Sequence, residues 1–386
     1  MTSRTLVKRG GAATAGFALL ALACGDGRAP SGLAAGALSD AANAAAHLQA
    51  IDRAVTTPAL RSFAAATAHL TSLGASALAP AAALAHAARP ATLEPPYARA
   101  ARQAEELRET LPLLDSLRAR SIFPPGVIGK TFVWDATLGS YRPSNRRGAP
   151  PNGVRLVLYA IDPRTQLPSS PLTEIGYADL TDESRGDAAT LRVVVVDATG
   201  RSPETVADYT IRGEYYLFSA ILAATGYFTD QATRVDFDMS LEASPLKSTF
   251  RSTFDLSPQS ARVAFNATFV PASANSVAVA VDYRITTGAR TVTASGPLTV
   301  ARTPDGDSLS GTITVRIDGR SFATITFGGP GPTFQGPAGR PLTADELELL
   351  EQLYAVPQDI LEAFEYAVKP LELWFRTGER VAGLKG

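Results

Sequence analysis

Apolar residues fall at every second position through most of the chain between Gly129 and Phe327. The alternation is clearest in segments 235–242, 263–269 and 277–285, where Val, Phe and Ile alternate with Asp, Ala, Arg and Ser. A period of two places one set of side chains on each face of a sheet. The pattern therefore predicts a half-buried antiparallel sheet, and we assign the β domain to residues 126–328.

Short turn signals separate many of these segments. The signals are Thr199-Gly200, Thr287-Gly288, Asp305-Gly306 and Asp318-Gly319. Short turns between long alternating strands predict an up-and-down meander. The predicted strands are Lys130–Asp135, Gly139–Arg142, Val154–Ile161, Thr173–Thr181, Thr190–Ala198, Val206–Arg212, Thr233–Glu242, Lys247–Leu256, Ala261–Val270, Ser276–Thr286, Arg290–Ala301, Ser308–Asp318 and Ser321–Phe327. Segment Tyr215–Phe228 is apolar on both faces, which predicts either a central strand covered on both sides or a short buried helix.

Helical spacing replaces the alternation before the sheet. Residues 37–120 are Ala-rich and predict three or four helices with narrow apolar stripes. In one of them Thr57 is the expected N-cap and Pro58 the first helical residue, with Leu60 and Phe63 on one side. Such stripes need a partner surface, which the sheet can supply.

A second helical segment, residues 342–386, follows a Gly/Pro-rich linker at 329–341 that has no strand or helix pattern. Thr343 and Glu346 have the spacing of a capping box at its start. Pro357 is expected to interrupt the helix. The apolar end of the segment includes Trp374 and Phe375.

The width of the sheet predicts its shape. About a dozen strands at roughly 4.8 Å spacing would extend on the order of 60 Å. Twisted sheets of that width seldom stay open and flat, so we expect the sheet to curl around its apolar face. The predicted fold is mainly β with flanking helices (α+β): a large curled antiparallel meander sheet or half-barrel packed against N-terminal and C-terminal helices. Either those helices or an apolar ligand must fill its interior. The predicted apolar-ligand face comprises Phe237, Met239, Phe265, Phe269, Val279, Val281 and Tyr283.

The start of the chain has the features of a secretory signal peptide. Residues 1–23 combine Arg4, Lys8 and Arg9 with a short apolar run that ends in small residues before Cys24. With Cys24 at the first mature position, the segment resembles the lipobox of bacterial lipoproteins. The resemblance implies a diacylglycerol thioether on Cys24, with further acylation of its amino group, and a tether at residues 24–36. Gly25 after the cysteine favours the outer membrane of the cell envelope over the inner membrane.

A second resemblance is architectural. A wide curled sheet with helices, in an envelope protein, is similar to the half-barrel carriers of the lipoprotein-localisation system, which hold acyl chains. The chain carries no motif of that family, so the resemblance transfers no functional residue.

Charge and composition exclude several classes of function. The 36 basic and 37 acidic residues give a net charge of −1 without a basic cluster, which excludes nucleic acid as a partner. One cysteine excludes an internal disulfide. His47, His69 and His86 lack the spacing of a metal site or the neighbours of a catalytic triad. We therefore predict no catalytic residue, no metal and no cofactor apart from the covalent lipid on Cys24.

Neighbouring carboxylates on one strand also have a structural interpretation. Asp236 and Asp238 share a strand face, and arginines recur on other strands at positions 251, 262, 284 and 316. Cross-strand ion pairing on a solvated face accounts for this pattern without an acid/base or calcium site.

Three functional hypotheses remain open. In the first, a membrane-anchored envelope lipoprotein binds an apolar small molecule, a lipid or a partner protein at its curled sheet. In the second, the helices fill the sheet and the lipoprotein is a structural scaffold. In the third, loops carry a hydrolase site.

Overall fold

The computed structural model describes residues 50–51, 53–69, 122–186, 188–216, 219–273, 275–288, 290–303, 306–329, 331–368 and 370. The predicted signal peptide, Cys24 and the tether lie outside the described residues. So do most of the predicted helical region 37–120, and Trp374 and Phe375.

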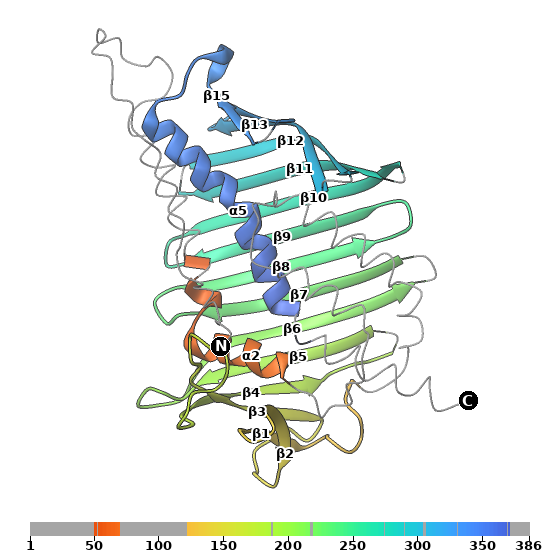
Figure 1. The fold of residues 1–386 in the computed structure, drawn as a ribbon, viewed down its shortest axis with the longest axis vertical. Helices are drawn as coiled ribbons and strands as arrows, with labels where there is room; N and C mark the ends of the chain where they lie inside the picture. The colour runs from red at the N-terminus through yellow and green to blue at the C-terminus, as the bar shows by residue number, and fades with distance from the viewer. Residues whose placement is uncertain are drawn as a thin grey trace, which may run out of the picture.

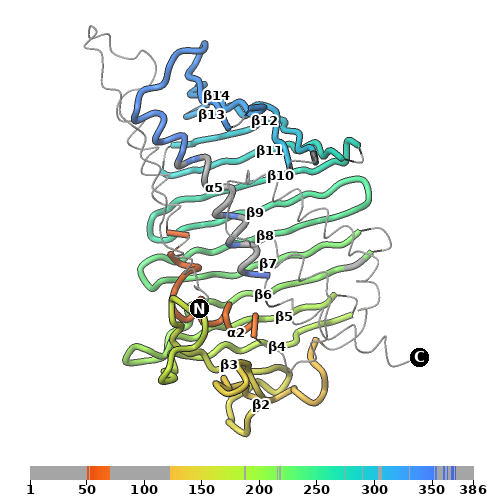
Figure 2. Tube along the Cα trace, viewed as in Figure 1, coloured from red at the N-terminus to blue at the C-terminus, as the bar shows by residue number. Residues whose placement is uncertain are grey.

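One sheet of fifteen strands dominates the structure (Figures 1 and 2). Consecutive strands are neighbours from β3 to β15, and β1 lies between β3 and β2. The β1–β3 pair is parallel, and the other pairs are antiparallel. The strands are β1 Lys130–Asp135, β2 Ser140–Ser144, β3 Gly153–Tyr159, β4 Glu174–Asp182, β5 Ala188–Asp197, β6 Glu204–Tyr216, β7 Ser219–Thr229, β8 Arg234–Ala243, β9 Ser248–Ser257, β10 Ala261–Ser273, β11 Ser276–Thr287, β12 Arg290–Thr303, β13 Gly306–Ile317, β14 Arg320–Phe327 and β15 Thr333–Gln335. The predicted antiparallel meander is confirmed.

Two local predictions need correction. The segment predicted as one unit over Tyr215–Phe228 contains a strand boundary, because Tyr215 and Tyr216 end β6 and Ser219 begins β7. The predicted linker 329–341 contains β15 and a short 3-10 helix, η3 Pro337–Gly339. β15 forms because Thr333–Gln335 folds back directly onto β14.

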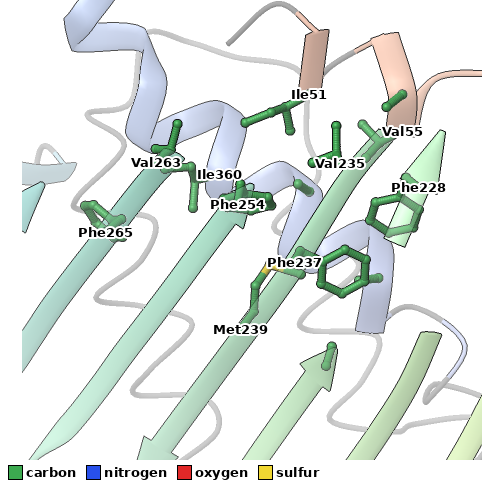
Figure 3. Packing of buried hydrophobic residues seen from close by; sticks show 14 of the residues in the cluster. Ile51, Val55, Phe228, Val235, Phe237, Met239, Phe254, Val263, Phe265 and Ile360 are labelled. Atoms are coloured by element: carbon green, nitrogen blue, oxygen red, sulfur yellow. The ribbon is translucent and has the colours of Figure 1, made fainter. Parts of the chain in front are cut away.

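Two of the helices that the structure describes cover the apolar face of the sheet. Helix α2, Pro58–Ala68, contacts β3 to β6, and helix α5, Ala344–Val368, crosses the strands obliquely and contacts β7 (Figure 1). Thr57 caps α2 as predicted, with its hydroxyl oxygen 3.4 Å from the N–H of Leu60. Figure 3 shows Ile360 of α5 and Ile51 and Val55 of the preceding helical segment beside the sheet's apolar side chains. The core is therefore the layer between sheet and helices.

The predicted curl is wrong, because the sheet is neither closed nor strongly curled. The prediction assumed that the sheet had to enclose its own apolar face. A layer of helices buries the same face without closure, and open sheets of this width occur in large proteins. Helix α5 crosses the strands over the open sheet (Figure 1).

Helix α5 is fixed at its first turn by a buried acid. Glu346 is 3% exposed and accepts two hydrogen bonds from the guanidinium of Arg340, at 2.6 and 2.8 Å. The predicted capping box is confirmed: the N–H of Thr343 donates to Glu346, and the N–H of Glu346 donates to the Thr343 hydroxyl.

The predicted interruption at Pro357 is wrong, because α5 continues through that position. Burial of Leu353 and Ile360 on either side offsets the loss of one helical hydrogen bond.

The edges of the sheet are protected against further strand pairing. On β2 the N–H of Tyr141 donates to the carbonyl of His69 at the end of α2, at 3.2 Å. Pro143 lies two residues further along the same edge and has no N–H to offer. At the other edge β15 has only three residues and leads into η3. Neither edge presents a long row of free donors, the feature that promotes edge-to-edge aggregation.

We predict that Gly226→Ala destabilises the protein by about 2 kcal/mol or more. Gly226 lies in β7 with φ of 154°, and an added Cβ would overlap the backbone of β6 and the Cβ of Tyr209. Urea unfolding of the two proteins measures the difference. Gly200→Ala is the matched control, because an added Cβ there has space, and it should change the free energy of unfolding little. Equal stability of the two variants would contradict the β6–β7 packing described.

We predict that Glu346→Gln lowers stability at pH 7 by about 1 kcal/mol or more. The hydrogen bonds from Arg340 hold the pKa of Glu346 below its usual value. Because the pKa of Glu346 is lower in the folded than in the unfolded protein, its ionised carboxylate stabilises the fold. This stabilisation is fully present above the unfolded pKa of about 4.3 and is lost as the pH falls through the folded-state pKa. The difference in unfolding free energy between wild type and variant should thus shrink below about pH 4.3. Glu351→Gln, which removes an exposed acid of the same helix, is the matched control for the loss of one charge; a pH-independent difference for Glu346→Gln would contradict the account.

Candidate functional site

The seven residues predicted as an apolar-ligand face lie together on one side of the sheet. They come from β8, β10 and β11, where Phe265 pairs with Tyr283 and Phe269 with Val279. Each of the seven is no more than 4% exposed. The structure therefore brings them onto one face, as the alternation predicts, and makes that face an interior.

The cover over this face is formed by the chain itself. Figure 3 shows Ile360 of α5 close to Phe254 and Val263, and shows Met239 beneath the helix. Leu349, Leu350 and Leu353 of α5 are also buried. The face is thus a contact layer between sheet and helices.

An aromatic group lies on this face where β6, β7 and β8 adjoin. The rings of Phe228 and Phe237 stack with centroids 4.5 Å apart, and the ring of Tyr209 lies 5.4 Å from Phe228 and 5.8 Å from Phe237. Gly226 is the β7 partner of Tyr209 and leaves room for the Cα and Cβ of Tyr209. Such pairs contribute about 0.5–1.5 kcal/mol beyond the burial of their area.

Two buried hydroxyls interrupt this apolar layer. The Tyr209 hydroxyl on β6 and the Ser252 hydroxyl on β9 have no hydrogen-bond partner among the described residues. Burial raises the pKa of Tyr209, so the phenol stays neutral and able to donate. An unsatisfied buried hydroxyl costs about 1–3 kcal/mol. These two groups are polar features of the interior that the sequence analysis missed; the signal was a polar residue at an inward position of an alternating strand.

Arginine–carboxylate pairs populate the opposite face. Arg155 on β3 donates two hydrogen bonds of 2.7 Å to Asp179 on β4, and its guanidinium lies 3.8 Å from the Tyr177 ring centroid. The predicted cross-strand pairing is wrong for Asp236, whose ion-pair partner at 2.7 Å is Arg234 of the same strand.

Two of the predicted strand arginines form cross-strand pairs on this face. Arg251 lies 4.0 Å from Glu242, and Arg262 lies 3.4 Å from Asp255. All four side chains are more than half exposed, so solvent screens these pairs and each contributes little to stability. The pairs chiefly neutralise the solvated face.

Among the described residues, the side chains considered for catalysis or metal binding do not lie together in one site. His69 is the one described histidine, and its ring lies 5.6 Å from Trp134 in an edge-to-face contact. His47 and His86 lie outside the described residues. Within the described ranges, no group of three or more His, Cys, Asp or Glu is placed to hold a metal ion.

No protein-family model, curated protein or solved structure matches this chain. The resemblances of the sequence to lipoproteins and to half-barrel carriers therefore stay predictions. Among the helices that the structure describes, none is long and apolar enough to span a membrane.

We predict that Tyr209→Phe leaves stability unchanged or raises it by up to about 1 kcal/mol, because it removes a buried hydroxyl that lacks a partner. Tyr141→Phe is the matched control: the Tyr141 hydroxyl is also buried but donates to the Val157 carbonyl at 2.9 Å. The control should lose about 1 kcal/mol. Thermal and urea unfolding of both variants give the comparison. A loss from Tyr209→Phe as large as that from Tyr141→Phe would show that the Tyr209 hydroxyl has a partner.

Proposed function

We propose that this protein is a lipid-anchored scaffold of the bacterial cell envelope, which acts by binding a partner protein and not by chemistry. One observation carries the proposal: the apolar face of the sheet is buried beneath the chain's own helices. A body with a filled interior offers its outer surfaces for contact. A loop-borne hydrolase has no supporting observation among the described residues.

The anchoring half of the proposal rests on residues 1–24. The basic start, the short apolar run and Cys24 support export and lipidation, and multiple acyl chains give stable attachment where one chain gives marginal binding. The outer membrane is the proposed site of attachment because Gly25 follows the cysteine.

A second candidate function is the transport or storage of an apolar ligand, with α5 as a displaceable cover. The observation that favours it is the pair of buried hydroxyls on Tyr209 and Ser252. A polar group of a lipid, such as a carboxylate or ester, would satisfy a hydroxyl that has no partner in the described structure.

We predict that Cys24→Ser releases the protein from the membrane, because serine cannot form the thioether to diacylglycerol. Flotation of envelope vesicles and intact mass measurement test this. The wild-type protein should float and carry the mass of its acyl groups, and the variant should do neither. A wild-type protein that lacks acyl mass would contradict the anchor.

Native mass spectrometry with lipid extraction separates the two functions. The scaffold predicts a ligand-free mass for the protein isolated from a bacterial envelope, and no uptake of an added fluorescent fatty acid. Co-purification of acyl lipid at fixed stoichiometry, reduced by Tyr209→Phe, would overturn the scaffold in favour of the carrier.

A further inference from the structure

In the meander, successive hairpin turns alternate between the two ends of the strands and so form two rows. The connections β6–β7, β8–β9 and β10–β11 lie at one end of the strands, and the connections β5–β6, β7–β8 and β9–β10 lie at the other end. Neighbouring turns of one row are two strands apart, about 10 Å. Each row is therefore a line of tips along one end of the sheet.

The first row exposes large apolar side chains. Leu246 in the β8–β9 turn is 81% exposed, Tyr216 at the end of β6 is 55% exposed, and Val270 near the end of β10 is 41% exposed. We call Tyr216, Leu246 and Val270 the apolar tips. A single exposed apolar residue is ordinary, but Tyr216, Leu246 and Val270 lie in or near three consecutive hairpin connections at the same end of the sheet, and together they form an apolar feature of that end.

The row of turns at the other end of the strands is polar rather than apolar. Its turns across the same strands are polar, with Arg201 and Ser202 between β5 and β6, Asp230 and Gln231 between β7 and β8, and Gln259 and Ser260 between β9 and β10. The exposed leucines at that end, Leu138 and Leu172, belong to connections of β1–β4, away from these strands. Over β5–β11 the sheet thus has one apolar end and one polar end.

The charges beside the apolar tips favour an anionic contact. Glu214 is paired with Arg212 at 2.5 Å, and Glu242 lies 4.0 Å from Arg251, so both acids are compensated. Lys247 follows Leu246 directly, is exposed, and has no ion pair within the described part of the chain. A cation beside exposed Leu and Tyr is the combination that suits a membrane surface with anionic lipids.

We propose that the apolar tips contact the phospholipid bilayer that holds the lipid anchor, and so set the orientation of the sheet on the membrane. The inference rests on the proposed lipidation of Cys24. The anchor alone does not set an orientation, because the predicted tether of residues 24–36 can reach on the order of 40 Å. Insertion of Leu246 and Tyr216, with Lys247 at the headgroups, would hold the strands steeply to the membrane and present the polar end to a partner.

The test uses the full lipidated protein in vesicles of phosphatidylethanolamine and phosphatidylglycerol. Leu246→Cys and Ser202→Cys place one environment-sensitive fluorophore in the apolar row or in the polar row, because the native Cys24 is blocked by its lipid. The expected result is a blue-shifted probe at residue 246, quenched at least about threefold more strongly by spin-labelled lipid than the probe at 202. Aspartate at residue 270, by Val270→Asp, should reduce that quenching.

Each other outcome overturns the inference in a distinguishable way. Equal, water-like emission at both positions, on protein that floats with the vesicles, would overturn the orientation and leave the anchor intact. A shielded probe at 246 that lipid spin labels do not quench would assign the apolar tips to a protein partner. Failure of the protein to float would overturn the anchor and the inference together.

Discussion

A single apolar sheet face, too wide to leave in water, is the constraint on which the rest of this structure depends. Fifteen strands at the spacing of a sheet give a surface on the order of 70 Å by 35 Å. Soluble monomers expose contiguous apolar patches of only a few hundred Å². The helices on either side of the sheet in sequence meet this need, with α2 over β3–β6 and α5 over the strands beyond. The fold is therefore two layers with a continuous core.

The same constraint shapes the surfaces that remain. The solvated face carries ion pairs such as Arg155–Asp179 and Arg262–Asp255, and so keeps a wide sheet polar on one side. The edges are closed by different means: the His69 carbonyl and Pro143 on β2, and a three-residue β15 on the far side. With the apolar face and the edges occupied, the solvated face and the exposed ends of the hairpins are the surfaces available for contact. This distribution supports the proposed scaffold and its proposed orientation, whereas the proposed membrane anchor rests on residues 1–24.

The strands were predictable from the sequence because the inward positions of each strand mostly carry apolar residues. β8 shows this, since its inward residues Val235, Phe237, Met239 and Leu241 are all buried. Local chemistry also predicted the Thr57 cap and the Thr343–Glu346 capping box. The β6–β7 boundary was missed because its connection lacks Gly, Asn, Asp or Pro, and β15 was missed because its pairing depends on β14 rather than on its own composition.

The shape of the sheet and the buried hydroxyls depend on tertiary contacts that no local pattern contains. The number of strands alone predicts that the sheet curls, but α5 buries the apolar face of the sheet without curling. Pro357 alone predicts a break in α5, yet the burial on both sides of it is a property of the packed layer. Tyr209 and Ser252 occupy inward positions that the period of two identifies, but the absence of a partner among the described residues emerges only when β6–β9 are assembled.

The most direct test of the covered face is the rate at which its buried methionine is oxidised. The chain has two methionines, Met1 and Met239, and removal of the signal peptide leaves Met239 alone. Met239 is fully buried between β8 and the helix layer, so its oxidation by dilute peroxide under native conditions should be slow and should accelerate only as urea unfolds the protein. Oxidation in native buffer at the rate of a free methionine would contradict the account, because it would show that the apolar face is open to solvent.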